Sequence, residues 1–223
     1  EELGLTSYRG DAAGARKAVV EDGADVNAAT FYAYTGTMGG TCTAAYVAAW
    51  HGHHGVLGVL LAAPVSADPD KGDTRSGVTP CHAACAFDHP DAVALLLAHG
   101  ADPNIADEDG WTPCMIAAYS GSTACLRALA EGAARQEGRT LDVNAVGTGG
   151  WPKGKTALDL AVQCNKEEAA AYLRDELGAL RAADLPPPRK PPKSAAKMRQ
   201  QAASSSLSAA AGGGAGAGAG AGA

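Results

Sequence analysis

The apolar positions of this chain fall into pairs of short helical segments that recur along the sequence. In the clearest pair, the small residues Ala83 and Ala84 lie in a first segment, and residues 93–97 read Val-Ala-Leu-Leu-Leu in a second. Apolar residues at three- and four-residue spacing indicate helices with one buried face. Because one helix pair cannot bury this face on its own, the pattern predicts a stack of pairs, with small residues where the inner helices meet.

A repeated motif opens every predicted pair after the first one. The sequence Thr-Pro-Cys-His-Ala-Ala at 79–84 returns 33 residues later as Thr-Pro-Cys-Met-Ile-Ala-Ala at 112–118. A threonine can cap a helix by accepting a hydrogen bond from a free backbone N–H, and proline is tolerated at the first helical position. Weaker openings at Thr43 and Thr156 give spacings of 36, 33 and 44 residues. A period of this length is typical of helical repeat arrays.

The motif at 79–84 and the sequence Gly-Ala-Asp-Pro-Asn at 100–104 together resemble the ankyrin repeat, whose signature opens Thr-Pro-Leu-His-x-Ala-Ala and closes Gly-Ala-Asp-x-Asn. The resemblance implies an all-α fold, an ankyrin-repeat solenoid of about five stacked helix-turn-helix units with finger loops. It covers residues 1–178, with a charged last helix that suits a terminal capping repeat. The expected repeats are 1–42, 43–78, 79–111, 112–155 and 156–178.

The remaining residues, 179–223, form a tail that is rich in proline and basic residues and then in glycine and alanine. Such a composition cannot bury a core, so we expect the tail to be disordered. Within it, 188–193 reads Pro-Arg-Lys-Pro-Pro-Lys, which is compatible with a polyproline ligand for an SH3-type domain. A weak nuclear signal in the basic residues and a plain linker are the alternatives.

Insertions interrupt the period at 28–41, 64–73, 135–140 and 146–155. The first insertion contains aromatic residues at 31, 32 and 34, and the last contains Trp151. Exposed aromatic residues on long loops suit a contact surface. The alternative is that they fold back onto the array, and both interpretations remain open at this stage.

Charge divides the chain into an acidic array and a basic tail. Residues 1–180 contain 12 basic and 23 acidic residues, whereas 181–223 contain six basic residues and one acidic residue. Phosphate contacts need clustered Lys and Arg, so the array is unsuited to nucleic acid. The sequence contains no run of 18 apolar residues, so it predicts no membrane-spanning helix. Six cysteines without a secretory signal suit a reducing compartment, so we expect a cytoplasmic protein, with the nucleus as the alternative.

Three sequences hint at chemistry, and repeat register explains each of them better. Cys81 stands at the Leu position of the repeat and Cys85 at an Ala position, beside the signature His82, and no second ligand pair is suitably spaced for zinc. The His-Gly-His-His sequence at 51–54 contains the signature Gly-His. The Gly-Lys-Thr at 154–156 lacks both the spacing and the strand of a phosphate-binding loop. We therefore expect no metal, no cofactor, no catalytic residue and no enzymatic activity.

The resemblance implies that a partner protein binds the concave face, which finger tips and the last turns of the inner helices form. Aromatic residues stand at these helix ends in four consecutive repeats, and aromatic side chains are enriched at interface hot spots. An acidic, aromatic finger tip beside them suits a partner with basic and apolar residues. The predicted partner-binding residues are Tyr8, Trp50, His51, Phe87, Glu108, Asp109, Trp111 and Tyr119. The alternative is that the aromatic residues pack between repeats, and Phe87 is the strongest candidate for this role.

The function that these patterns predict is a protein–protein interaction module. The alternative is the targeting or substrate-recognition arm of a larger enzyme or channel, of which this chain is a fragment. We keep both, because the chain starts at Glu1 without an initiator Met, inside an expected helix.

Overall fold

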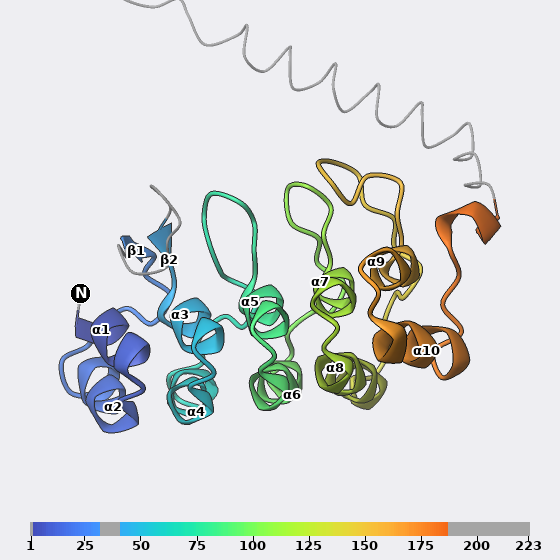
Figure 1. The fold of residues 1–223 in the computed structure, drawn as a ribbon. Coiled ribbons are helices and arrows are strands. Elements are labelled where there is room, and N and C mark those ends of the chain that lie inside the picture. The colour runs from blue at the N-terminus through green and yellow to red at the C-terminus, as the bar shows by residue number, and fades with distance from the viewer. Residues whose placement is uncertain (1, 32–40, 187–223) are drawn as a thin grey trace, which may run out of the picture. The chain divides into compact units, whose positions relative to one another are not determined.

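A computed structural model describes residues 2–31 and 41–186 (Figure 1). Within these ranges ten α-helices form five consecutive pairs. They are α1 (Glu2–Arg9), α2 (Ala12–Val20), α3 (Ala44–Trp50), α4 (His54–Leu61), α5 (Pro80–Ala86), α6 (Pro90–Ala98), α7 (Pro113–Ser120), α8 (Thr123–Arg135), α9 (Ala157–Gln163) and α10 (Glu167–Asp175). The strands β1 (Thr30–Phe31) and β2 (Thr41–Cys42) pair antiparallel, and a 3₁₀ helix spans Ala182–Asp184.

The helices of the array lie in two layers. Figure 1 shows the odd-numbered helices α1, α3, α5, α7 and α9 in one row and the even-numbered helices in a second row below it. The long loops that connect successive pairs project from the odd-numbered row, on the side away from the even-numbered row (Figure 1). This arrangement confirms the predicted stack of helical pairs with finger loops.

Side-chain size differs between the two layers as the sequence predicts. Nine of the helical alanines that are 1% exposed or less lie in the odd-numbered helices, namely Ala45, Ala48, Ala49, Ala83, Ala84, Ala117, Ala118, Ala157 and Ala161, and four lie in the even-numbered helices, namely Ala15, Ala92, Ala133 and Ala169. Seven of the eight leucines buried to the same degree lie in the even-numbered helices: Leu57, Leu60, Leu96, Leu97, Leu126, Leu129 and Leu173; the eighth, Leu160, lies in α9. Small residues let the inner helices approach closely, and bulky residues fill the space behind them.

The threonines that open the repeats cap their helices. The hydroxyls of Thr43, Thr79, Thr112 and Thr156 each accept a hydrogen bond from the backbone N–H three residues later. Each hydroxyl thereby satisfies one of the backbone donors that lack a partner in the first turn of a helix. The capping role predicted for Thr79 and Thr112 is confirmed.

Side chains in the turns between repeats form a second series of links. The side-chain oxygens of Asn27, Asp70, Asn104 and Asn144 each accept a hydrogen bond from a backbone N–H in the next turn along the array. The last donor is Leu180, which therefore occupies the position that the next turn would take. Ala179 is 3% exposed, and the Thr156 hydroxyl donates to the Leu180 carbonyl over 2.8 Å. Residues 179–182 thus pack on the array, past the boundary predicted at 178.

Some of the sequence predictions lie outside the described residues. These are the aromatic side chains of the first insertion and the tail from residue 187 onward, which includes the proline-rich sequence at 188–193. Within the described ranges, none of the helices has the length and apolar character needed to cross a membrane.

Candidate partner-binding surface

The aromatic residues predicted at the inner-helix ends divide into two groups. We call Tyr8, Tyr46, Trp50, His51 and Phe87 the N-terminal aromatic cluster, because each of these rings contacts another member of the set. We call Trp111, Tyr119 and Trp151 the C-terminal aromatic cluster, because these three rings contact one another. The aromatic residues predicted at four consecutive inner-helix ends therefore belong to two clusters among the described residues.

The N-terminal aromatic cluster rests on the core. Its Trp50 ring lies 4.3 Å from Phe87 and 5.8 Å from Tyr46, measured between ring centroids. Tyr46 is 2% exposed, whereas Trp50 is half-buried and Phe87 is 44% exposed. Phe87, the strongest candidate for packing between repeats, directly follows α5, and its ring contacts Trp50 of the preceding repeat while much of it stays exposed. Tyr8 meets His51 edge to face at 4.9 Å.

The C-terminal aromatic cluster is assembled from three different segments. Trp111 follows a finger, Tyr119 ends α7, and Trp151 lies in the long loop before α9. Trp111 and Trp151 stack with their centroids 5.7 Å apart, and Tyr119 meets both rings edge to face at 5.6 and 5.3 Å. Tyr119 is 47% and Trp151 45% exposed. Trp151 therefore folds back onto the array, which is one of the two alternatives given for it, and much of its surface stays exposed.

Acidic residues lie at the tip of the finger beside this cluster. Asp107 has a structural role, because its Oδ1 accepts hydrogen bonds from the backbone N–H groups of Asp109 and Trp111 at 3.0 and 2.8 Å. Burial raises the pKa of Asp107, although these hydrogen bonds act in the opposite direction. Glu108 and Asp109 are exposed, and neither is in a salt bridge within the described residues. These two carboxylates are available to a partner.

Backbone hydrogen bonds join neighbouring fingers near their tips. The N–H of Thr74 donates to the Thr41 carbonyl over 3.0 Å, and that of Glu108 donates to the Ser76 carbonyl over 3.1 Å. Farther along the array, the N–H of Gly149 donates to the Asp109 carbonyl over 2.8 Å. Because each finger is fixed to the next, the fingers form a continuous edge of the array.

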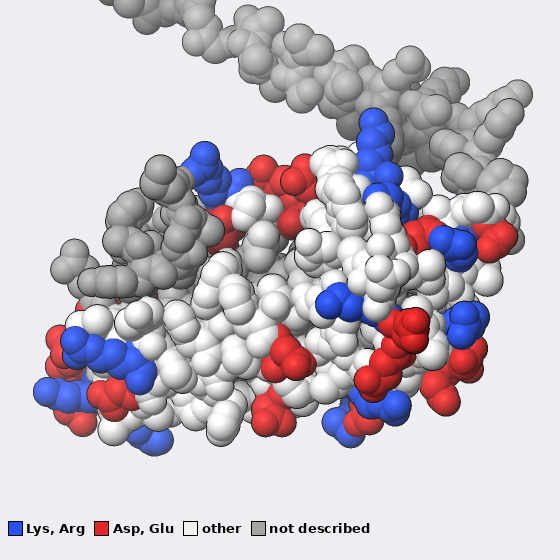
Figure 2. All heavy atoms as spheres, viewed as in Figure 1, with Lys and Arg blue, Asp and Glu red and all other residues white. Residues whose placement is uncertain are grey.

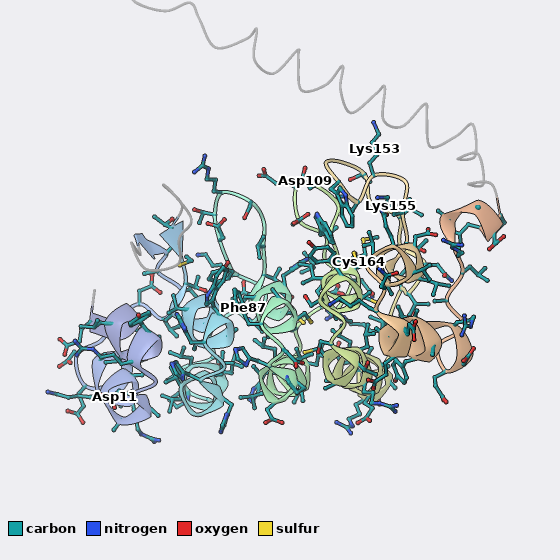
Figure 3. The ribbon with its side chains drawn as sticks, in the orientation of Figure 1. Asp11, Phe87, Asp109, Lys153, Lys155 and Cys164 are labelled. Carbon is teal, nitrogen blue, oxygen red and sulfur yellow. The ribbon has the colours of Figure 1, made fainter. Side chains whose placement is uncertain are left out.

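Charged side chains are unevenly distributed over this face. Figure 2 shows acidic and basic side chains together along the finger edge and few of either over α3 and α5. Figure 3 places Phe87 at the row of inner helices and Asp109, Lys153 and Lys155 at the fingers. The surface thus has few charged side chains over α3 and α5 and a charged part at the fingers, beside the C-terminal aromatic cluster.

His82 connects two repeats beneath the surface. Its Nδ1 accepts hydrogen bonds from the Thr79 backbone N–H and hydroxyl, at 3.1 and 2.8 Å, and its Nε2–H donates to the Trp111 carbonyl over 2.9 Å. This pattern assigns the neutral imidazole with its proton on Nε2. Burial lowers the pKa of His82 from 6.5 to about 4, so the ring remains neutral near pH 7. The signature histidine is a structural link.

The cysteine and histidine residues that could have been metal ligands or nucleophiles have structural surroundings as well. Within the described ranges, no group of three His, Cys, Asp or Glu side chains is arranged to hold a metal ion. Cys81, Cys85 and Cys114 are buried free thiols, and burial raises the pKa of Cys114 to about 12. A protonated, buried thiol is a poor nucleophile. Burial, followed by the nearby charges of His53 and His89, lowers the pKa of His51.

The structure thus brings the eight predicted residues to two neighbouring clusters and adds three that were not among the predicted partner-binding residues, namely Tyr46, Trp151 and Lys155. Tyr46 lies one helical turn before Trp50, so helical spacing could have found it. Trp151 was noticed as a loop aromatic, but nothing in the sequence placed it on Trp111. Lys155, whose Nζ lies 4.1 Å from the centroid of the Trp151 ring, had no sequence signal.

Comparisons with known proteins agree with this architecture. A family model described as ankyrin repeats (3 copies) matches residues 17–107, 45–145 and 100–182. The chain is 34% identical over 106 residues to protein phosphatase 1 regulatory subunit 12A of Mus musculus, a match that covers 48% of this chain and 9% of that protein. It is 32% identical over 114 residues to the target of rapamycin complex 2 subunit AVO2 of Saccharomyces cerevisiae, covering 51% and 25% of the two chains.

A third relative is an enzyme by name. The chain is 44% identical over 50 residues to the human 2-5A-dependent ribonuclease, a match that covers 22% of this chain and 7% of the ribonuclease. The chain therefore spans a quarter or less of the length of each of these three relatives.

Proposed function

Because this chain belongs to the ankyrin-repeat family, whose repeats are protein-interaction modules, we propose that it binds a partner protein on the face that carries the two aromatic clusters. The partner contacts Tyr8, Trp50, His51, Phe87 and Tyr119 at the inner-helix ends. Glu108, Asp109 and Trp111 contribute the finger edge. The partner presents apolar side chains to the rings and basic side chains to the carboxylates.

The observation that carries this proposal is the exposure of large aromatic side chains on one side of the array. Phe87, Tyr119 and Trp151 are each 44–47% exposed, although aromatic residues make up only 5% of the chain. Their rings are held by other rings, so they lose little side-chain entropy when a partner binds. The linked fingers add a prearranged edge, which lowers the cost of ordering on association.

The proposal is tested by measuring affinity and melting temperature for the same variants. A partner is first isolated with the full chain from cells that express it, and its affinity is then measured with purified proteins. The double variant Phe87→Ala and Tyr119→Ala should bind at least about tenfold more weakly, because hot-spot aromatic residues contribute this much or more. Val20→Ala is the matched control, because Val20 is 58% exposed on α2, in the other helix layer.

Two outcomes decide the proposal. A weaker affinity at an unchanged melting temperature supports it, provided that the control binds normally. An unchanged affinity of the double variant means that the partner docks elsewhere on the molecule.

A second candidate function is recognition on behalf of a larger protein. The observation that favours it is the small share of each relative that the chain covers, such as 9% of the phosphatase regulatory subunit and 7% of the ribonuclease. In this case the array selects a partner or substrate, and another domain of the same polypeptide acts on it. The full-length transcript tests this candidate, since it either encodes a further domain or does not.

The array and the tail have separate proposed roles. We place the boundary of the array near residue 185, because residues 179–182 pack on the last repeat. Limited proteolysis should remove the tail and leave a resistant array. In the tail, the SH3-type ligand and the nuclear signal are tested by deleting residues 185–199, and unchanged partners together with an unchanged location would leave only the linker role.

A further inference from the structure

The C-terminal aromatic cluster already holds one cation of this chain. The Nζ of Lys155 lies 4.1 Å from the centroid of the Trp151 ring. An ammonium at this distance is attracted by the electron-rich face of an indole, which is the strongest of the aromatic partners for a cation. None of the three salt bridges within the described residues involves Lys155. The Trp151 ring is therefore the contact that the structure shows for the Lys155 ammonium.

Carboxylates make the surroundings of the cluster favourable to positive charge. Asp109 lies directly against the turn that precedes Trp151, since a Cβ added to Gly150 would stand 3.1 Å from its carboxylate oxygen. Glu108, the preceding residue at the finger tip, is exposed. As neither carboxylate is in a salt bridge within the described ranges, the acidic charge beside the rings is not neutralised by such a contact.

The Trp151 ring, which contacts the ammonium of Lys155, is accessible and is held in place by neighbouring rings. Trp151 is stacked on Trp111 and is 45% exposed, and Tyr119 braces both rings edge to face. Lys155 reaches Trp151 with a flexible side chain, although its backbone is fixed by the hydrogen bond from its N–H to the Pro152 carbonyl. The side chain can therefore leave the ring without any change in the loop.

We propose that the C-terminal aromatic cluster is a binding site for a cationic side chain, an arginine guanidinium or a lysine ammonium, on a peptide segment of the partner protein. Lys155 occupies this site when the partner is absent and is displaced when the partner binds. The inference rests on the proposed function, because it requires that this face contacts a protein. It adds the chemistry of one anchoring side chain and the internal residue that competes with it.

The site can be tested without knowing the partner. The full chain is labelled with ¹⁵N, and the indole N–H signals are followed while N-acetyl-arginine amide or N-acetyl-lysine amide is added. The Trp151 signal, identified by its absence in Trp151→Phe, should shift and approach saturation with both cationic probes. The uncharged N-acetyl-norleucine amide, which has a similar apolar stem, should leave it unchanged. A shift with norleucine equal to that with the cations would overturn the proposal.

Lys155 and Lys153 provide a matched pair of variants. Lys155→Met removes the competing ammonium, so the cationic probes should bind about threefold to tenfold more tightly, in the range expected for one cation–aromatic contact. Lys153→Met removes the same charge from the same loop, but Lys153 makes no cation–aromatic contact with any of the described residues, so only a small electrostatic gain is expected. Equal gains in the two variants would mean that long-range charge alone is responsible, and the competing role of Lys155 would be wrong.

Two further results keep this inference separate from the proposed function. Trp151→Leu should abolish the saturable shift of the remaining indole signals while the melting temperature stays close to that of the unaltered chain. A partner that needs Phe87 but binds Trp151→Leu normally would leave the proposed function standing and overturn the cation site. A Trp151 signal that moves with N-acetyl-glutamate amide instead would show a site for anionic side chains, which also overturns it.

Discussion

The two aromatic clusters arise from the same sequence signal and reach different environments. In the N-terminal cluster, Trp50 stands one turn after the buried Tyr46 and packs on the array, and Phe87 covers it. In the C-terminal cluster, Tyr119 ends an inner helix as Trp50 does, but it meets rings from a finger and a long loop. An aromatic residue at this repeat position can therefore support the fold, form contact surface or do both, depending on the loops beside it.

This difference predicts how each cluster divides its effect between stability and binding. Trp50 lies against buried side chains, so its truncation affects folding as well as any partner. Trp151 lies against other exposed rings, so its truncation affects the surface while leaving the array nearly intact. The four predictions below test this division, beginning with the largest effect.

His82, which links two neighbouring repeats, should make the free energy of unfolding depend on pH. Burial lowers the pKa of His82 from 6.5 to about 4, so the unfolded chain takes up this proton at a higher pH than the folded chain does. The free energy of unfolding should therefore be fully retained above about pH 6.5 and should fall by about 3 kcal/mol as the pH drops to about 4. Urea denaturation across this range measures the loss.

The matched variant for this prediction is His82→Asn, which lacks the titrating ring. Its stability at pH 7 should be lower, because the link to the Trp111 carbonyl is altered. Its decline between pH 6.5 and 4 should be shallower than that of the unaltered chain. Parallel curves for the two proteins would assign the acid sensitivity to other groups, such as His51, whose pKa is also lowered.

Trp50→Ala should reduce both stability and affinity. Because Trp50 is half-buried between Tyr46 and Phe87, we expect the free energy of unfolding to fall by about 2 kcal/mol, less than for a fully buried tryptophan. Thermal and urea melting measure this loss. A change below about 0.5 kcal/mol would remove the contrast with the C-terminal cluster, because Trp50 would then be pure contact surface.

The acidic finger tip should act mainly on the rate of association. Glu108→Lys combined with Asp109→Lys reverses two exposed charges, so the association rate of a basic partner should fall by roughly tenfold at low salt. The effect should fade at high salt, whereas the dissociation rate should change little. Stopped-flow measurement at two ionic strengths separates these quantities. A loss of affinity that persists at high salt would indicate direct, buried contacts instead.

Trp151→Ala should have the smallest effect on stability. Because Trp151 is 45% exposed and its contacts are with partly exposed rings, the free energy of unfolding should change by less than about 1 kcal/mol. Partner affinity should nevertheless fall. If the variant unfolds as readily as Trp50→Ala does, the loop before α9 stabilises the array, and the two clusters contribute equally to the free energy of unfolding.

Much of the candidate surface could be predicted because it follows repeat register. Trp50 and Tyr119 each lie seven residues after an opening threonine, and Phe87 lies eight residues after Thr79, so their positions at the inner-helix ends follow from the spacing of these threonines. Trp151 could not be assigned in this way, because it lies in an insertion without a register. Its contact with Trp111 joins residues that are distant along the chain, and only the conformation of both loops decides whether such rings meet.

The sequence by itself determined the helical pairs, their caps and the layers of small and large apolar residues. These features depend on local conformational preferences and on a period that repeats in the chain, so each copy strengthens the assignment. Only the tertiary structure decided that the aromatic residues form two clusters, that Lys155 covers Trp151, and that residues 179–182 dock on the last repeat. These features depend on where non-repeating segments fold back, and a local pattern of residues carries no information about contacts at that distance.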